Sequence, residues 1–337
     1  MNPVQAWNVF WFRPVSARPL AAFRVVMGFL TLAHLGLLMC DLDHWLTDHG
    51  LLQGTESRDF AGVWRPSPLH WIQDPASIRL FMGTTAIVAT LFTLGWKTKV
   101  NGILLYLMVL SIHHRNIASN SGPDNVLLLM LFYLMLSPCG AAYSLDARRE
   151  ARRRGTLAEP LILPWAQRLI QLQLCLIYLD TAILKCNGGT WLGGTAMHFV
   201  FYNRELGRFD LSALTQYPIL INLLTTGALF VEFALAFLLW FRATRTWMIF
   251  LGLALHVGVL FVVNVPLFGE LMTACYLTFL TPQELDSAIH ALNPWRLFRG
   301  KARTFAIIPG RVDQPATSVL KGPHSDESVR IENELSV

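Results

Sequence analysis

The chain has 337 residues, of which 53% are hydrophobic and only 15% are charged, and its formal net charge is +5 at pH 7. This composition is too apolar for a soluble domain of that length, and the long apolar runs indicate a polytopic membrane protein. Nucleic-acid binding is not indicated, because the basic residues lie in short clusters between the apolar runs.

The N-terminal segment, residues 1–18, predicts an interfacial stretch that lies on the membrane, with aromatic side chains toward the lipid and arginines toward the headgroups. Because these residues interrupt the segment before any apolar core, it is not a cleavable signal peptide. The first span follows at about 19–39. Arg24, near its start, is expected to snorkel to the headgroups. His34 lies deep in the span, as either a hydrogen-bonded core histidine or a functional residue.

Eight spans are predicted in all, so the fold expected for residues 19–285 is an all-α, polytopic transmembrane helical bundle with amphipathic interfacial segments. A tryptophan-rich acidic loop at 41–77 is expected to pack back over this bundle. Residues 286–337 predict a largely disordered tail. The spans lie at about residues 19–39, 78–96, 100–112, 126–141, 165–184, 219–241, 246–263 and 266–280.

The basic clusters of the chain fall on alternate turns between the predicted spans. They lie at residues 13–18, 97–99, 148–154, 242–245 and 296–303. Because basic loops stay in the cytoplasm, both termini and the tail are expected to be cytoplasmic. The acidic 41–77 loop, the turn at His114 and the loop after Lys185 then share the opposite face.

The stretch CLIYLDTAILKCNGGTWLGGTAMHF, residues 175–199, carries ionisable residues at the end of the fifth span. Asp180 lies inside the span, where a charge costs about 3 kcal/mol and usually pairs or lines a cavity. Lys185 ends the span, and a glycine turn and Trp191 follow it. Two roles are open for this lysine, a snorkelling anchor or a reactive amine. The polar features expected on the same face favour the reactive amine.

The turn HHRNIASNSGPDN, residues 113–125, places many polar groups between two apolar segments. It is either a polar hairpin loop or a polar wall that holds a small ligand. The side chains that would line such a wall are those of His114, Asn116, Asn120 and Asp124.

No metal site is expected from the sequence. Asp43, His44 and His49 resemble metal ligands, but no second cluster has metal-site spacing. The five cysteines contain no CxxC pattern, which argues against a zinc site or a disulfide framework.

Several motifs within residues 12–285 resemble the HTTM family of vitamin K-dependent gamma-carboxylase-like membrane proteins. They are SARPLAAFRVVMGFL, HHRN followed by SNSGPDNVLLL, SPCGAAYSLD, YLDTAILKCNGGTWLGG, FVEFALAF and LALHVGVLFV. In the animal carboxylase a lysine ahead of a tryptophan–glycine motif is the base that activates vitamin K hydroquinone. The matching residue is Lys185, ahead of Trp191 and Gly194. The resemblance implies that His256 assists in the site, and His114 loosely matches an earlier turn.

The resemblance also implies the chemistry. Lys185, as a neutral amine, would take a proton from a reduced quinone, either vitamin K hydroquinone or menaquinol. Reaction with oxygen would then give a base strong enough to remove an unactivated C–H proton, which requires a dry cavity. No metal is implied, and no nucleotide or flavin motif is present.

Two features depart from the carboxylase. The carboxylase has a large luminal domain that binds its protein substrate, and this chain has no counterpart of it. The spacing from Lys185 to Trp191 is also one residue longer than is usual for the motif. The family also resembles a bacterial membrane protein needed to mature a secreted toxin. Three functions therefore stay open: a quinol-linked carboxylase or epoxidase-like enzyme, a non-catalytic maturation factor for a secreted peptide or protein, and a small-molecule transporter. A transporter is disfavoured because no internal repeat is visible.

The expected location is the bacterial inner (cytoplasmic) membrane, which the chain crosses several times. Its expected partners are membrane lipids, a secreted peptide substrate and a soluble protein, with no nucleic acid.

Overall fold

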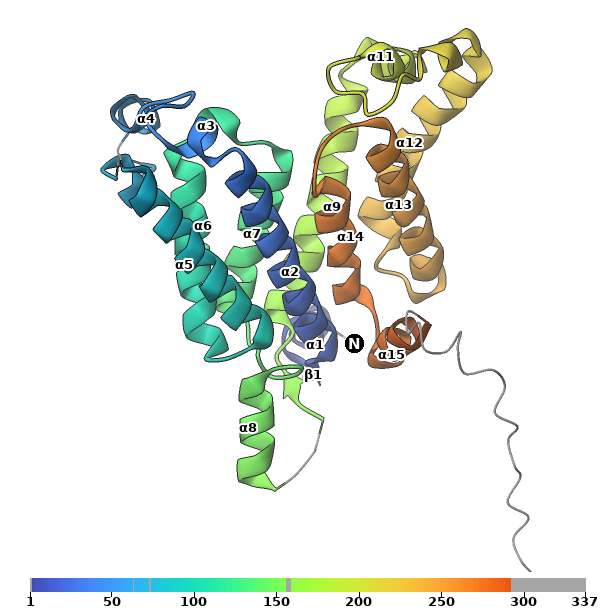
Figure 1. The fold of residues 1–337 in the computed structure, drawn as a ribbon. Helices are drawn as coiled ribbons and strands as arrows, with labels where there is room; N and C mark the ends of the chain where they lie inside the picture. The colour runs from blue at the N-terminus through green and yellow to red at the C-terminus, as the bar shows by residue number, and fades with distance from the viewer. Residues whose placement is uncertain (1, 63, 73, 156–158, 292–337) are drawn as a thin grey trace, which may run out of the picture. The chain divides into compact units, whose positions relative to one another are not determined.

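The computed structural model describes residues 2–62, 64–72, 74–155 and 159–291 as a bundle of helices (Figure 1), which confirms the predicted all-α class. The helices are α1 (Pro3–Phe12), α2 (Arg18–Cys40), α3 (Leu42–Leu46), α4 (Gly54–Ala61), α5 (Pro75–Leu94), α6 (Thr98–Arg115), α7 (Gly122–Leu136), α8 (Leu145–Arg154), α9 (Trp165–Cys186), α10 (Gly189–Leu192), α11 (Ala196–Tyr202), α12 (Pro218–Leu238), α13 (Arg242–Val262), α14 (Phe268–Cys275) and α15 (Pro282–Ala291). The shorter elements are the 3-10 turns η1 (Pro68–His70), η2 (Ile117–Ser119), η3 (Ser212–Gln216) and η4 (Tyr276–Phe279), and the strands β1 (Val15–Ser16) and β2 (Leu161–Ile162).

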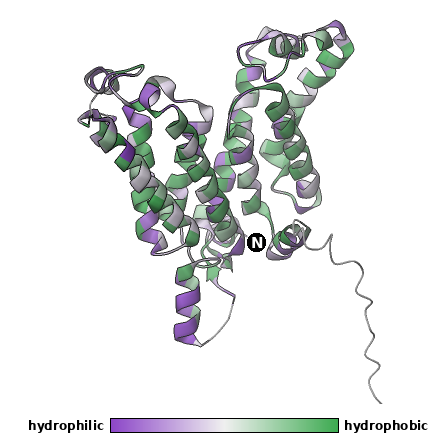
Figure 2. Ribbon diagram, in the orientation of Figure 1, coloured by the Kyte–Doolittle hydropathy of each residue, from purple (hydrophilic) through white to green (hydrophobic). Residues whose placement is uncertain are grey.

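Five helices, α2, α5, α9, α12 and α13, are long and apolar enough to cross a membrane, and each coincides with a predicted span. Figure 2 shows the apolar residues on these helices and the polar ones concentrated on α8. Helix α7 is apolar but has 15 residues, and α14 has eight before it continues as η4. Eight helical residues rise only about 12 Å, less than the ~30 Å hydrocarbon core. The chain is therefore a multi-pass membrane protein, while the count of eight crossings stays a prediction.

Arg24 does not snorkel to the membrane surface as expected but is fully buried in α2. Its guanidinium donates to three backbone carbonyls, those of Thr93, Cys139 and Tyr143, at 2.7–3.3 Å. Thr93 lies in the last turn of α5, where carbonyls lack intrahelical partners and the helix dipole favours a cation. The two Nη atoms are thus held by the end of α5 and by the segment between α7 and α8, while Nε has no partner among the described residues.

Gly95 makes this arrangement possible. It ends α5 in the left-handed conformation, with φ +71°, which glycine adopts at no steric cost. A Cβ at this position would lie 2.7 Å from Nη1 of Arg24 and 2.3 Å from Cβ of Ser144. Any other residue would therefore displace the arginine or the chain after α7.

Segments far apart in the sequence meet at the end of the bundle that carries α8. β1 pairs antiparallel with β2, and Arg18 forms an ion pair with Asp286 of α15. Asp146 accepts hydrogen bonds from the backbone amides of Lys97 and Thr98 at 3.0 and 2.7 Å. Although burial opposes it, these bonds hold the pKa of Asp146 below its usual value. The basic segments 13–18 and 97–99 are thus held at this end of the bundle by contacts with β2, α15 and the first turn of α8.

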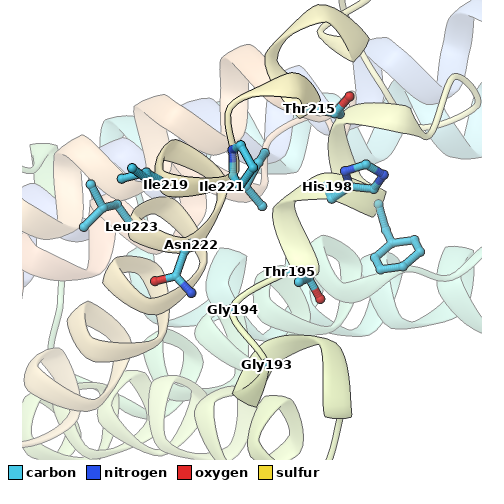
Figure 3. A pocket seen from close by; sticks show the side chains of 11 residues that line it. Gly193, Gly194, Thr195, His198, Thr215, Ile219, Ile221, Asn222 and Leu223 are labelled. Carbon is cyan, nitrogen blue, oxygen red and sulfur yellow. The ribbon is translucent and has the colours of Figure 1, made fainter.

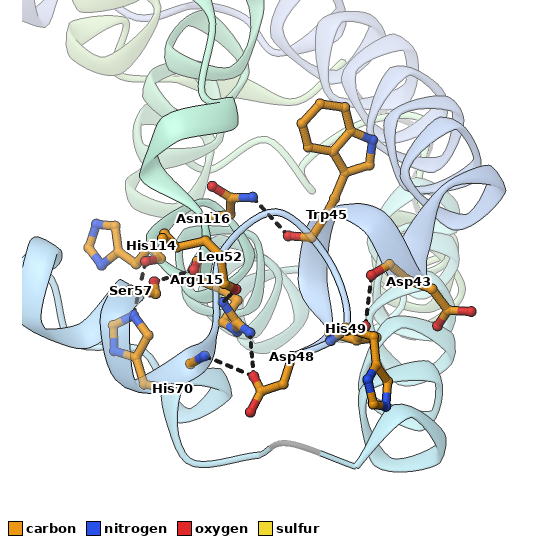
Figure 4. Close-up of polar contacts among 12 residues, drawn as sticks. Asp43, Trp45, Asp48, His49, Leu52, Ser57, His70, His114, Arg115 and Asn116 are labelled. Atoms are coloured by element: carbon orange, nitrogen blue, oxygen red, sulfur yellow. Dashed lines mark hydrogen bonds and ion pairs between the residues drawn. The ribbon is translucent and has the colours of Figure 1, made fainter.

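The 41–77 loop folds back over the end of the bundle away from α8, as predicted, and carries α3, α4 and η1 (Figure 1). Figure 4 shows the polar contacts of this loop. Arg115, at the end of α6, donates to the Asp48 carboxylate and the Leu52 carbonyl, each at 2.9 Å. Asn116 donates to the Trp45 carbonyl at 2.9 Å. The loop is therefore fastened to the helix ends by buried polar contacts.

Helix α15 runs from Pro282 to Ala291 and so crosses the boundary expected after residue 285. The rest of the predicted tail, residues 292–337, lies outside the described residues.

Candidate functional site

Lys185 lies in the last turn of α9 but turns its amine back into the bundle. Its Nζ donates to Oε1 of Glu232, a residue of α12, and lies 4.9 Å from the ring centroid of Trp191. The side chains of Lys185 and Glu232 are 24% and 11% exposed. An anchor would instead extend its amine toward headgroups and water.

The packing of α9 against α12 sets the level of this ion pair. Cys175 Sγ lies 4.0 Å from the carbonyl oxygen of Leu235. Tyr178 lies about one turn after Cys175 in α9, and Glu232 about one turn before Leu235 in α12, so the two face the same layer of the bundle. Tyr178 precedes Lys185 by seven residues, so both project from the same face of α9.

Tyr178 connects this layer to two other elements through a buried hydrogen-bond chain. Its hydroxyl lies 2.7 Å from Nε2 of His256 in α13 and 2.5 Å from the hydroxyl of Tyr276 in η4. One arrangement accounts for both hydrogen bonds: Tyr276 donates to Tyr178, and Tyr178 donates to Nε2 of a neutral imidazole, which then carries its proton on Nδ1. His256 is 4% exposed and faces the bundle interior, as expected of an ionisable residue within a span.

Gly252, one turn before His256 on α13, leaves the space that the Tyr276 hydroxyl occupies. A Cβ on Gly252 would lie 2.0 Å from that oxygen. The hydrogen-bond chain therefore depends on the absence of a side chain at this position of α13.

Three buried polar atoms in this region have no hydrogen-bond partner among the described residues. They are Oε2 of Glu232, Nδ1 of His256 and Oε2 of Glu270 in α14. Buried polar groups are normally paired, so atoms of this kind mark places where a ligand or water can bind.

Two cavities lie beside the N-terminal half of α12. One, of about 780 Å³, lies between α12 and the segment after Trp191, and is lined by Gly194, His198 and Asn222 among others (Figure 3). The other, of about 300 Å³, lies among α11, α12 and α13 and is almost entirely apolar. Leu223 lines both, so the two spaces are neighbours.

The glycines after Trp191 shape the larger cavity. Gly194 has φ +70°, and a Cβ there would lie 1.9 Å from Nδ2 of Asn222. The Trp–Leu–Gly–Gly sequence thus lets the chain turn closely over α12, with Trp191 above the lysine.

The structure gathers only some of the predicted site residues around Lys185. Trp191 contacts its amine, and His256 belongs to the adjoining hydrogen-bond chain. Asp180 lies on an exposed side of α9, away from the face that carries Tyr178 and Lys185.

The predicted polar wall lies elsewhere, against α2 and the 41–77 loop. His114 bonds the Pro66 carbonyl through Nδ1 at 3.0 Å, and Asn120 donates to the backbone carbonyl of His113. Asp124 faces His34 of α2. Among the described residues no hydrogen bond or ion pair joins this group to Lys185.

Sequence reasoning left three residues of the site unassigned: Glu232, Tyr178 and Tyr276. Glu232 is the one charged residue within α12, and a buried charge in a span calls for a partner. Tyr178 could be found from its two-turn spacing to Lys185. Tyr276 gives no such signal, because it follows the end of α14 and reaches the site through its tertiary position.

Comparison with known proteins identifies the relatives of the chain. The model of the HTTM domain matches residues 12–283. The uncharacterized protein YitO of Bacillus subtilis is 22% identical over 232 residues, which are 66% of this chain and 73% of that protein. The sporulation-delaying protein SdpB of the same organism is 20% identical over 219 residues, 61% of this chain and 65% of that protein. No solved structure matches the chain.

Proposed function

The chain belongs to the HTTM family of vitamin K-dependent carboxylase-like membrane proteins, and from this premise we propose that Lys185 is a general base acting on a reduced lipid quinone. The proposed activity is oxygen-coupled carboxylation or epoxidation within the membrane. One observation carries the proposal: the amine of Lys185 is held inside the bundle by Glu232 and Trp191.

The Lys185–Glu232 pair supports the role of Lys185 as a base, because the shared proton can reside on either the amine or the carboxylate. In apolar surroundings an isolated charge is costly, so a lysine and a carboxylate can exist as two ions or as a neutral amine and acid. In the neutral arrangement Lys185 has the lone pair needed to accept a proton from a ligand hydroxyl. Glu232 then acts as a positioning residue that holds the amine and takes up its proton.

The residues around the pair suit a reduced quinone. A quinol ring is apolar on its faces and carries two hydroxyls. One hydroxyl can donate to the unpartnered Oε2 of Glu232, beside the Lys185 amine, and the other oxygen can accept from the unpartnered Nδ1–H of His256. The apolar cavity of about 300 Å³ offers space for hydrocarbon between the same helices. A reduced quinone would supply the oxygen-consuming step when bound, while Lys185 moves the proton and the helices exclude water.

Oxygen uptake by the purified full-length chain tests this proposal. The protein is placed in lipid nanodiscs with menaquinol or vitamin K hydroquinone, bicarbonate and a glutamate-rich peptide. The wild type is expected to consume oxygen faster than protein-free discs, and Lys185→Ala to lose about 10² to 10⁴ of that rate. Lys99→Ala, a lysine bonded to the Met135 carbonyl of α7, is the matched control. Equal uptake by wild type and Lys185→Ala would contradict the proposal.

A second candidate is a non-catalytic maturation factor for a secreted peptide or protein, acting with a soluble partner. Two observations favour it: the similarity to the sporulation-delaying protein SdpB, and a cavity of about 780 Å³ that is larger than a single quinol ring needs. In this case cells that lack the chain would lose the processing of a secreted product, and Lys185→Ala would restore it as well as the wild type. Failure of Lys185→Ala to restore processing would favour the enzyme.

A further inference from the structure

Three metal-ligating side chains converge from three different helices at the end of the bundle covered by the 41–77 loop. His34 comes from α2, His113 from the last turn of α6, and Asp124 from the first turn of α7. One ligand atom from each lies within 4.8 Å of the other two. Their side chains are 12%, 5% and 15% exposed, so the group is largely shielded from solvent.

Only one pair of these three side chains lies within hydrogen-bond distance. The Nε2 atoms of His34 and His113 are 3.2 Å apart. Asp124 Oδ1 lies 3.6 Å from Nδ1 of His34 and 4.0 Å from Nε2 of His113, too far for a hydrogen bond to either ring. Two ligand atoms bound tetrahedrally to one zinc ion lie about 3.4 Å apart. If His34 binds through Nδ1, its distance of 3.6 Å to Asp124 Oδ1 is close to that spacing, and the distance of 4.0 Å from His113 Nε2 to the same oxygen is somewhat longer.

The carboxylate is oriented by its own helix. Asp124 Oδ2 accepts from the backbone amide and the hydroxyl of Ser121, at 2.7 and 2.8 Å, which caps the start of α7. These bonds leave Oδ1 directed at the two imidazoles. Asn120 donates to the His113 carbonyl at 3.0 Å and so ties the turn between the two ligands. Outer contacts of this kind fix the ligands of metal sites.

A cavity of about 220 Å³ reaches all three side chains. It is also lined by Asn120 and by Leu267, which has φ +63° at the start of α14. A branched side chain rarely adopts this conformation, and such strain collects at functional sites. The cavity has room for water or a small ligand at the coordination positions that three protein ligands leave open.

We propose that His34, His113 and Asp124 bind one divalent transition-metal ion, such as Zn²⁺ or Fe²⁺, with its open positions directed at this cavity. Two imidazoles and one carboxylate are a ligand set for either ion, and calcium or magnesium would require more oxygen atoms. The ion also balances the charge of a carboxylate shielded from water. This site is separate from Lys185 and does not depend on the proposed quinol chemistry.

Metal binding by the full-length chain tests the proposal directly. The protein carries a tag without histidine, is stripped with a chelator in detergent, and is titrated with Co²⁺ as a visible probe and then with Zn²⁺ in competition. The wild type is expected to bind about one ion per chain. His34→Gln, His113→Gln and Asp124→Asn should each weaken binding by at least about 10²-fold. His114→Gln, whose ring bonds the Pro66 carbonyl, is the matched control and should bind as the wild type does.

Two further readouts keep the test decisive. Asp124→Asn retains an oxygen for the Ser121 cap, so a monodisperse Asp124→Asn protein that no longer binds separates ligand loss from misfolding. X-ray absorption of the zinc-loaded wild type should show only nitrogen and oxygen ligands. Sulfur scattering, which would indicate Cys40 or Cys186, or unchanged affinity in all three ligand variants, would overturn the proposal. Lys185→Ala should bind the ion normally, whatever its effect on oxygen uptake.

Discussion

Two ion pairs at the helix ends, Arg115–Asp48 and Lys185–Glu232, use similar charges in different surroundings. Arg115 is fully buried, and its guanidinium also donates to the Leu52 carbonyl, while its own backbone carbonyl accepts from Ser57. Lys185 is 24% exposed and has one carboxylate partner under the ring of Trp191.

The difference follows from the chemistry of the two cations. A guanidinium offers five fixed donors and stays charged, so Arg115 joins the 41–77 loop to α6 permanently. An amine can lose its proton, and Lys185 has few contacts that would hold it in one state. The comparison supports a structural role for Arg115 and the proposed role of Lys185 as a base.

The largest expected effect is in the labelling of introduced cysteines, which either occurs from a given side of the membrane or does not. It tests the prediction that the two ion pairs lie on the same side. In a cysteine-free background, Arg152→Cys in α8 and Arg204→Cys in the loop after α11 should react with an impermeant maleimide from opposite sides of intact membranes. Both positions are exposed, and the basic clusters predict that α8 lies on the cytoplasmic side. Labelling of both from one side would contradict the eight-span prediction and the shared face of the two pairs.

The next effect is on activity, in the quinol-dependent oxygen assay. Lys185→Arg should lose about 10² to 10⁴ of the rate although it keeps the positive charge, because a guanidinium cannot act as a base. Its expression and unfolding temperature should stay near those of the wild type. A small soluble amine should partly rescue Lys185→Ala but not Lys185→Arg. Full activity of Lys185→Arg would contradict the role of a base and favour that of a snorkelling anchor.

At the Arg115–Asp48 pair, a substitution should lower the stability of the protein, whereas at Lys185 it should lower activity and leave stability near that of the wild type. Arg115→Met removes a fully buried guanidinium together with its bonds to the Asp48 carboxylate and the Leu52 carbonyl, which should cost roughly 3 kcal/mol of unfolding free energy. Denaturant unfolding in detergent measures this. The control is Arg79→Met, because the Arg79–Asp43 pair is more than half exposed and should contribute under about 1 kcal/mol. Equal losses in the two variants would remove the structural role given to Arg115.

The sequence predicted the fold well where apolar runs are long. The first, fifth and sixth spans agree with α2, α9 and α12 to within a few residues, because a continuous apolar run leaves few other choices. The family was also predicted correctly, from motifs spread over most of the chain. The eighth span, predicted at 266–280, agrees least with the structure, because α14 ends after eight residues and continues as the 3-10 turn η4.

The contacts between helices could not be predicted in the same way. Arg24 near the start of a span suggested snorkelling, yet it binds carbonyls that only the folded bundle brings together. His34 precedes His113 by 79 residues, so no local spacing predicted their contact. Lys185 was found from its motif, but its partner Glu232 depends on the packing of α9 against α12.

The smallest effect is a pH dependence in the loop that Arg115 holds. The Nε2 of His70 lies 3.0 Å from the His114 carbonyl, so a neutral ring donates this bond. Burial lowers the pKa of His70 below 6.5, and the nearby charge of Arg115 acts in the same direction, while the bond to His114 opposes them. In the unfolded chain the ring protonates near pH 6.5, before the folded protein does.

The sign of the pH effect follows from this order of protonation. Above pH 6.5 both states are neutral at His70, and the residue makes no pH-dependent contribution to stability. As the pH falls below 6.5, the unfolded state binds the proton first, so the unfolding temperature should fall between pH 7.5 and 5.5. His70→Gln keeps a donor for the His114 carbonyl and removes the titration, so it should reduce that fall. His44→Gln, an exposed histidine of α3, should leave it as in the wild type. An identical fall in all three proteins would show that His70 is not its source.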